Sequence, residues 1–422
     1  MTLFRLVLCL LCLAAGGVRL EQERRAGRLQ QVDEAFLDLL TANTRDRLTQ
    51  VDPQAPDQVV LVTLREADRK EFAAWPPPPL DWQTLLKALA AYTPEVVILT
   101  EPLQWGEPKP DFVPAVAEAL LAFPSVVLGL PTREAGSKEN ADALDLPAYG
   151  RVRGDPPEVA AAGTPRLLPV PEVRGLAELG LLTTGGEGLP YVLRQGDALV
   201  PGLLAQALAR RTRTPFTSQS LRLGPGAGAH LNQGVHVPLT PDGRFLPESD
   251  RPVPTVNALQ LMTGALADTL SDSEREALGS GRIAVIGIEA ADGSSTARRY
   301  AQALQQILSL PRLRQLTQME EWAVAGLAGL IALWTAARTR RHRALLAGLG
   351  WMFAALVACF LAFQTALVWC PPTLPVFALA CGSLIARLFG ARAESQGQRA
   401  QSQAPGAEAA ATEPSNGSDG PA

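Results

Sequence analysis

Four stretches of the chain are apolar without alternating with polar residues, and β-branched residues dominate them. They are residues 58–63, 96–100, 125–129 and 282–287. A strand covered on both faces has this pattern, so each stretch is predicted to be a buried β-strand. Apolar residues recur at three- and four-residue spacing in residues 80–91 and 113–123, which predicts two helices. Strands alternating with helices over short connections predict an α/β domain with a largely parallel sheet flanked by helices.

The region between the third and fourth of these strands has weaker patterns. Residues 132–171 are rich in Pro, Gly and Ala and are predicted to form long loops with at most one helix. The elements predicted after them are a strand at 191–194, a helix at 200–210, a strand at 234–238 and a helix at 255–265. After the last buried strand, either Ser294 or Ser295 can cap a helix that runs to about residue 308.

Three long apolar stretches lie in the C-terminal part, at residues 322–337, 344–370 and 374–389. A membrane-spanning helix needs roughly 20 such residues, and Trp322 and Trp334 favour interfacial anchoring. The arginine cluster at 338–343 separates the first two stretches, and cationic loops stay in the cytoplasm, so the residues before 322 are predicted to lie outside. Two alternatives remain open: the first two stretches could be core helices of a soluble protein, and the third could be a re-entrant hairpin.

A further apolar stretch covers residues 6–18. Small residues at 14–17 suit a signal peptidase, whereas residues 3–20 could span a membrane if Arg5 and Arg19 reach opposite faces. An uncleaved anchor is the favoured interpretation, although several arginines follow it on the predicted outer side. Apolar positions at helical spacing then predict a helix over residues 20–48.

These patterns divide the 422 residues into four parts. They are an N-terminal anchor or signal-like segment (1–20), an extracytoplasmic domain (21–318), three transmembrane helices (319–390) and a disordered cytoplasmic tail (391–422). The tail has scarcely an aliphatic residue larger than alanine, so it cannot bury enough surface to fold. The net charge of -4 is too small to indicate nucleic-acid binding.

Motifs for known chemistry are weak in this chain. Residues 287–294 follow a strand and open a helix, but their spacing differs from a phosphate-binding loop and no lysine follows. His230 and His236 have no accompanying carboxylate cluster, so we expect no metal site there. All five cysteines lie in or beside apolar segments, and no Gly-x-Ser-x-Gly motif occurs. We therefore expect no catalytic centre and no cofactor.

In a parallel sheet, ligands bind in the crevice beyond the carboxyl ends of the strands. Eight residues of the loops that follow predicted strands are expected to gather there. They are Arg65, Glu66, Asp68, Glu101, Trp105, Arg133, Glu289 and Asp292. The alternative is that these are solvated loop charges without a ligand.

Several motifs recur in the order that one family shows. A strand with an acidic turn lies at residues 59–68, Trp75-Pro76 leads into a helix, and Asp111 stands before the next helix. Residues 237–243 and the strand ending in Gly287 follow. In this order, and with three apolar stretches after them, they resemble the second class of CHASE domain, a sensory module of bacterial receptors. The resemblance implies an extracytoplasmic α/β domain between an N-terminal anchor and three membrane helices.

The resemblance also implies a function. We expect a receptor-like sensor in the bacterial inner membrane, with residues 21–318 in the periplasm and a small-molecule ligand of unknown identity. No output domain follows residue 390, so the signal is expected to pass to a separate effector protein, cytoplasmic or in the membrane. The alternatives are a structural or assembly partner of an envelope complex and a membrane-bound enzyme. The expected partners are thus the lipid bilayer, the effector and the ligand, and no nucleic acid.

Overall fold

In the computed structural model, the described residues are 15–19, 22–23, 26, 29–106, 111–132, 144–154, 159–183, 187–247, 252–263, 271–279, 282–338 and 341–384. The chain forms two compact units. One comprises Thr41–Arg314, and the other combines Met1–Leu40 with Gln315–Ala422.

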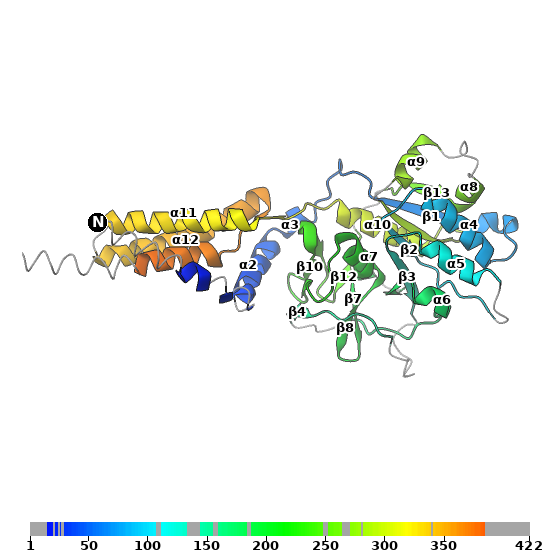
Figure 1. Ribbon diagram of the computed structural model, residues 1–422, viewed down its shortest axis with the longest axis horizontal. Coiled ribbons are helices and arrows are strands. Elements are labelled where there is room, and N and C mark those ends of the chain that lie inside the picture. The colour runs from blue at the N-terminus through cyan, green and yellow to red at the C-terminus, as the bar shows by residue number, and fades with distance from the viewer. Residues whose placement is uncertain are drawn as a thin grey trace, which may run out of the picture. The chain divides into compact units, whose positions relative to one another are not determined.

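A sheet of six parallel strands is the centre of the Thr41–Arg314 unit (Figure 1). In spatial order its strands are β13 (Thr255–Asn257), β1 (Val59–Arg65), β14 (Ile283–Glu289), β2 (Val96–Leu99), β3 (Val126–Pro131) and β5 (Glu178–Leu182). The four strands predicted from continuous apolar runs are β1, β2, β3 and β14, and all four are confirmed. Both faces of these strands are covered, which explains why their sequences do not alternate.

Successive side chains of each strand pack into two separate cores. On one face, Val60, Val97 and Ala284 pack against a layer of helices. Its helices are α4 (Pro79–Ala90), α5 (Val113–Leu120), α6 (Pro171–Arg174), α8 (Ala258–Thr263) and α9 (Asp272–Leu278). On the other face, Val59 and Val96 pack against α7 (Leu203–Thr212) and α10 (Thr296–Leu308) (Figure 1). The predicted α/β class with a parallel sheet between helices is therefore confirmed.

A β-rich insertion lies between β5 and β13 and packs on the α7 and α10 side. It contains most of a four-stranded sheet in the order β11 (His236–Pro238), β10 (Gly228–His230), β9 (Ser220–Arg222) and β4 (Arg151–Arg153). Two strand pairs complete it: β7 (Val192–Gln195) with β8 (Ala198–Pro201), and β6 (Leu189–Pro190) with β12 (Arg244–Phe245).

Two helix predictions in this half need correction. The first three residues of the helix predicted at 255–265 form β13, which pairs with β1, and the helix begins only at Ala258. Val200, predicted as helical, belongs to β8, and α7 begins at Leu203. A strand of three or four residues is too short to show an alternating pattern. When it runs directly into a helix, the helical pattern in the sequence therefore includes the strand residues.

The second unit contains α2 (Gln30–Asn43), α11 (Gln318–Arg338), α12 (Arg341–Ala366) and the shorter helix Thr373–Leu384. The short strands β15 (Arg314–Gln315) and β16 (Val368–Trp369) precede and follow the long helices, whereas α3 (Arg45–Leu48), which follows α2, belongs to the Thr41–Arg314 unit. A Cβ atom added to Gly382 would lie 2.3 Å from the Cβ of Ala332, and one added to Gly348 would lie 2.3 Å from Ser383 Oγ. Glycine therefore allows α11, α12 and the shorter helix to approach closely.

Of the three predicted membrane spans, the middle one has the length and composition of a span. Leu346–Ala366, within α12, has 21 residues and is the one described helix that meets both criteria. The first turn of α11 contains Glu320 and Glu321, which shortens its apolar part, and Thr373–Leu384 is shorter still. Residues 1–14, 20 and 385–422, with most of the predicted anchor and all of the predicted tail, lie outside the described residues.

Candidate functional site

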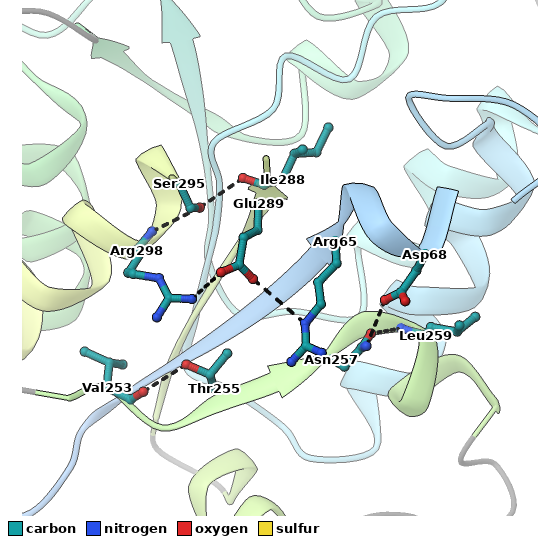
Figure 2. Close-up of polar contacts among 10 residues, drawn as sticks. All are labelled: Arg65, Asp68, Val253, Thr255, Asn257, Leu259, Ile288, Glu289, Ser295 and Arg298. Atoms are coloured by element: carbon teal, nitrogen blue, oxygen red, sulfur yellow. Dashed lines mark hydrogen bonds and ion pairs between the residues drawn. The ribbon is translucent and has the colours of Figure 1, made fainter. Parts of the chain in front are cut away.

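Arg65 and Glu289 are the last residues of β1 and β14, and the strand register places them side by side. Arg65 Nε lies 3.9 Å from Glu289 Oε2 (Figure 2). The Glu289 side chain is only 14% exposed, whereas that of Arg65 is 49% exposed. The structure therefore brings together two of the predicted site residues at the carboxyl end of the parallel sheet.

A second guanidinium group reaches the same carboxylate. Arg298, in the first turn of α10, places Nη2 2.5 Å from Glu289 Oε1 (Figure 2). Glu289 thus lies between two cations, and each of its oxygens contacts one of them. Arg298 Nε is buried and has no hydrogen-bond partner among the described residues. Two guanidinium groups placed in this way can bind a carboxylate or another oxyanion, and in the structure they bind the Glu289 carboxylate.

The first turn of α10 is held in place by its capping residue. Ser295 Oγ accepts a hydrogen bond from Arg298 N at 3.4 Å and donates one to Ile288 O at 2.9 Å. A cap of this kind satisfies an N–H group that the helix itself leaves free. Here it also ties α10 to the end of β14, so Arg298 and Glu289 keep their relative position (Figure 2).

Three more of the predicted acidic residues form hydrogen bonds that join neighbouring loops. Asp68 Oδ2 accepts from Asn257 Nδ2 at 2.9 Å, while Asn257 Oδ1 accepts from Leu259 N at the start of α8 (Figure 2). Glu66 Oε2 accepts from Ala291 N at 3.0 Å. Glu101, just after β2, accepts from Ile288 N at 3.2 Å. These bonds link the loops after four adjacent strands into one polar network.

Glu101 differs from the other acids in its burial. Desolvation raises the pKa of its carboxyl, and the hydrogen bond from Ile288 N partly offsets this. The charged form is therefore disfavoured at this position.

Of the other predicted residues that the structure describes, Trp105 and Asp292 do not join this network. Trp105 Nε1 donates to Pro77 O at 3.4 Å, and the ring packs against the helical core. Asp292 accepts from Ser294 N at 2.8 Å within its own turn, and the hydrogen bonds with Ser294 lower the pKa of the Asp292 carboxyl. Arg133 lies outside the described residues.

The family that matches this chain is the CHASE2 domain, over residues 7–338. The chain belongs to the CHASE2 domain family. No curated protein and no solved structure matches it. CHASE2 is an extracellular sensory domain family, so the resemblance seen in the sequence is confirmed and a sensory role fits the chain. The match extends from before α2, through the α/β unit, to the end of α11.

Sequence reasoning missed two members of the network in this CHASE2 domain, Arg298 and Asn257, which both contact predicted acids. Ser295 was one of two predicted caps of the helix, and the structure confirms it and adds its hydrogen bond to Ile288 O. Arg298 lies on the first turn of the helix after the loop, whereas the predicted site residues were taken from the loops themselves. The first helical turn after each strand-ending loop is therefore also a place for site residues.

A hollow of about 510 Å³ lies at the opposite end of the sheet, where β5 begins. Glu178, Arg210, Arg213 and Phe216 contribute to its walls, and Arg210 forms an ion pair with Glu178. None of the seven predicted residues within the described ranges lines it. Among the described residues, no group of three or more His, Cys, Asp or Glu side chains could hold a metal ion.

Proposed function

We propose that this chain is a membrane-anchored sensor whose CHASE2 domain lies outside the cytoplasm and responds to a small anionic molecule. The observation that carries the proposal is the CHASE2 match over residues 7–338. The site is the polar network at the carboxyl end of the sheet, centred on Glu289. A ligand carboxylate or phosphate would compete with Glu289 for Arg65 and Arg298, since both are partly exposed.

Helix α10 supports a route for the signal. Its first turn carries Arg298, and its other end lies where the chain enters and leaves the α/β unit. There Gln305 Oε1 accepts from Gln58 N at 2.9 Å and from Val59 N at 3.1 Å. A helix of 13 residues is about 20 Å long and moves as a rigid element. A change at Glu289 is thus expected to reach residues 309–314, which lead to α11.

The membrane part of the proposal rests on α12. Its segment Leu346–Ala366 has the length and composition of a span, and arginines lie just before it at 338–343. Cationic segments favour the cytoplasmic side. We therefore place residues 338–343 in the cytoplasm and the Thr41–Arg314 unit of the CHASE2 domain outside, with α11 and helix Thr373–Leu384 as further membrane helices. An effector protein in trans, reached through these helices or their cytoplasmic loop, would receive the signal.

The proposed coupling predicts that Glu289→Gln, measured in the full chain in detergent, loosens both ends of α10. Loss of the shared carboxylate charge should cost about 1 kcal/mol locally, or about fivefold in the local opening equilibrium. Hydrogen exchange followed by mass spectrometry should therefore become faster at residues 296–300 and at 309–314. Lys87→Gln, which removes an exposed charge on α4, serves as the matched control and should change neither region. Faster exchange confined to residues near 289 and 298 would contradict the route through α10.

A further inference from the structure

His230 and His236 stand opposite each other on the antiparallel strands β10 and β11. Their ring centroids are 4.5 Å apart, the ring planes are inclined by 33°, and the two Nδ1 atoms are 3.3 Å apart. The chain contains only one other histidine, His342, in the arginine cluster that precedes the apolar part of α12. Two titratable rings therefore share one nitrogen-to-nitrogen contact inside the CHASE2 domain.

The surroundings of this pair favour neutral rings. Burial lowers the pKa of both histidines, that of His236 to about 4. Two charged groups act on the pair among the described residues, Arg153 of β4 on His230 and Arg45 of α3 on His236, and both are cations. In the neutral pair one Nδ1 can donate to the other. If both rings take up a proton, both Nδ1 atoms are donors and the contact becomes repulsive.

The pair has little room to adjust within the closed hairpin. A Cβ atom added to Gly228 of β10 would lie 2.6 Å from His236 Cε1, so the ring lies directly against the neighbouring backbone. Ser220 of β9 stands opposite His230 on the other side of β10 and accepts a hydrogen bond from Arg153. Repulsion between charged rings at this distance would therefore favour separation of the two strands.

The β10–β11 hairpin, residues 228–238, also contacts the segment that leaves the α/β unit. Leu313 N donates to Gly234 O at 2.7 Å. Gly234 has a φ of +71°, and a Cβ atom there would lie 1.9 Å from Leu313 O. On the incoming side, Arg45 Nη2 donates to Leu239 O at 2.9 Å, directly after β11. Opening the hairpin would therefore release the outgoing segment and disturb the incoming one.

We propose that the proton is a stimulus of this domain, because protonation of the His230–His236 pair opens the β10–β11 hairpin and frees residues 309–314. This site is distinct from the Glu289 network and uses a different stimulus. It depends on the proposed function only for the step from residues 309–314 to the membrane helices.

The sign of the pH dependence follows from proton uptake. The open hairpin exposes both rings, which then have ordinary pKa values near 6.5, so below that pH the open form binds more protons than the closed form. Each histidine shifts the equilibrium toward the open form by up to about tenfold per pH unit until its ring is protonated in the closed form also. The two together can shift it by up to about a thousandfold between about pH 7.5 and about pH 5.

The test is hydrogen exchange on the full chain in detergent at about pH 7.5 and about pH 5, with each rate corrected for the intrinsic effect of pH. The wild-type chain should lose at least about tenfold in protection at residues 228–238 and at 309–314. The double variant His230→Phe with His236→Phe keeps two stacked rings that cannot titrate, and it should lose none. Residues 96–99 in the central sheet should stay protected in both chains, which separates hairpin opening from acid unfolding.

If the double variant does not fold, His236→Asn and His230→Asn replace it, and each should retain about half of the response on a logarithmic scale. The proposal is overturned if wild-type protection is unchanged at pH 5, or if wild type and non-titrating variants lose it equally. The result is independent of the Glu289→Gln experiment, because hairpin opening can occur whether or not α10 couples Glu289 to residues 309–314. Failure of one proposal can therefore be told from failure of the other.

Discussion

Gly287 lets β14 approach both β2 and α10. A Cβ atom at this position would lie 2.2 Å from Thr100 Oγ1 and 2.5 Å from the Ala297 Cβ. Gly287→Ala is therefore expected to lower the free energy of unfolding by about 1–3 kcal/mol through overpacking. Thermal unfolding of the full chain in detergent measures this, with Gly106→Ala as the control because no atom lies within 4 Å of the added methyl group. Equal stability of the two variants would contradict the close approach of β14 to α10 at Gly287.

Glu101 offers a test of electrostatics at the candidate site. Its raised pKa means that the folded state binds a proton more tightly than the unfolded state, so stability falls as the pH rises above the ordinary carboxyl value of 4.5. Glu101→Gln removes this penalty while its amide oxygen can still accept from Ile288 N. The variant should have the higher Tm at neutral pH, and the difference should shrink toward about pH 4. A lower Tm at neutral pH would show that the charged carboxylate has a stabilising partner.

The predicted site residues that joined the network share one feature. Arg65, Glu66, Asp68, Glu101 and Glu289 all end a strand or follow it directly, and the carboxyl ends of parallel strands meet at one edge. Asn257 could not be predicted in the same way, because β13 was interpreted as the start of a helix. The histidine pair was considered only as a metal site, and the sequence does not reveal that a tight hairpin turn places the two rings in register.

At the scale of elements, the sequence left two candidates for the cap of α10, and the structure selects Ser295. Ser295→Ala should destabilise the domain by about 1 kcal/mol, since one helix N–H group loses its acceptor. Ser294→Ala is the matched control: it removes a hydroxyl that bonds to the exposed Asp292 in the preceding turn but caps nothing in α10. Thermal unfolding of both variants should separate them by several degrees, and a larger effect for Ser294→Ala would contradict the assignment.

The central strands could be predicted from sequence and the edge strands could not. β1, β2, β3 and β14 are buried on both faces and therefore contain continuous apolar runs. β5, with the sequence Glu-Leu-Gly-Leu-Leu, has no β-branched residue, and β13 has only three residues. The order of the strands also required the structure, since β14 (Ile283–Glu289) lies between β1 and β2 although β2 already ends at Leu99.

At the scale of the whole molecule, the second unit depends on close helix packing. Gly382→Leu would place a large side chain against Ala332 of α11, whereas Gly350→Leu on α12 would meet no atom within 4 Å of its Cβ. We expect Gly382→Leu to separate the helices and to lower the free energy of unfolding of this unit by about 1–3 kcal/mol, as is typical of overpacking, with a lower Tm in detergent. Gly350→Leu should leave it unchanged. Equal behaviour of the two variants would contradict the packing of helix Thr373–Leu384 against α11.

The central claim is that the Thr41–Arg314 unit of the CHASE2 domain and the arginine cluster at 338–343 lie on opposite sides of a membrane. Single cysteines in a chain whose five native cysteines are replaced by alanine can report each side. Asp197→Cys lies at the exposed tip of the β7–β8 hairpin, and Arg340→Cys lies in the cluster. In intact cells, a membrane-impermeant maleimide should label position 197 and should label position 340 only after lysis. Labelling of position 340 in intact cells, with position 197 protected until lysis, would contradict the account.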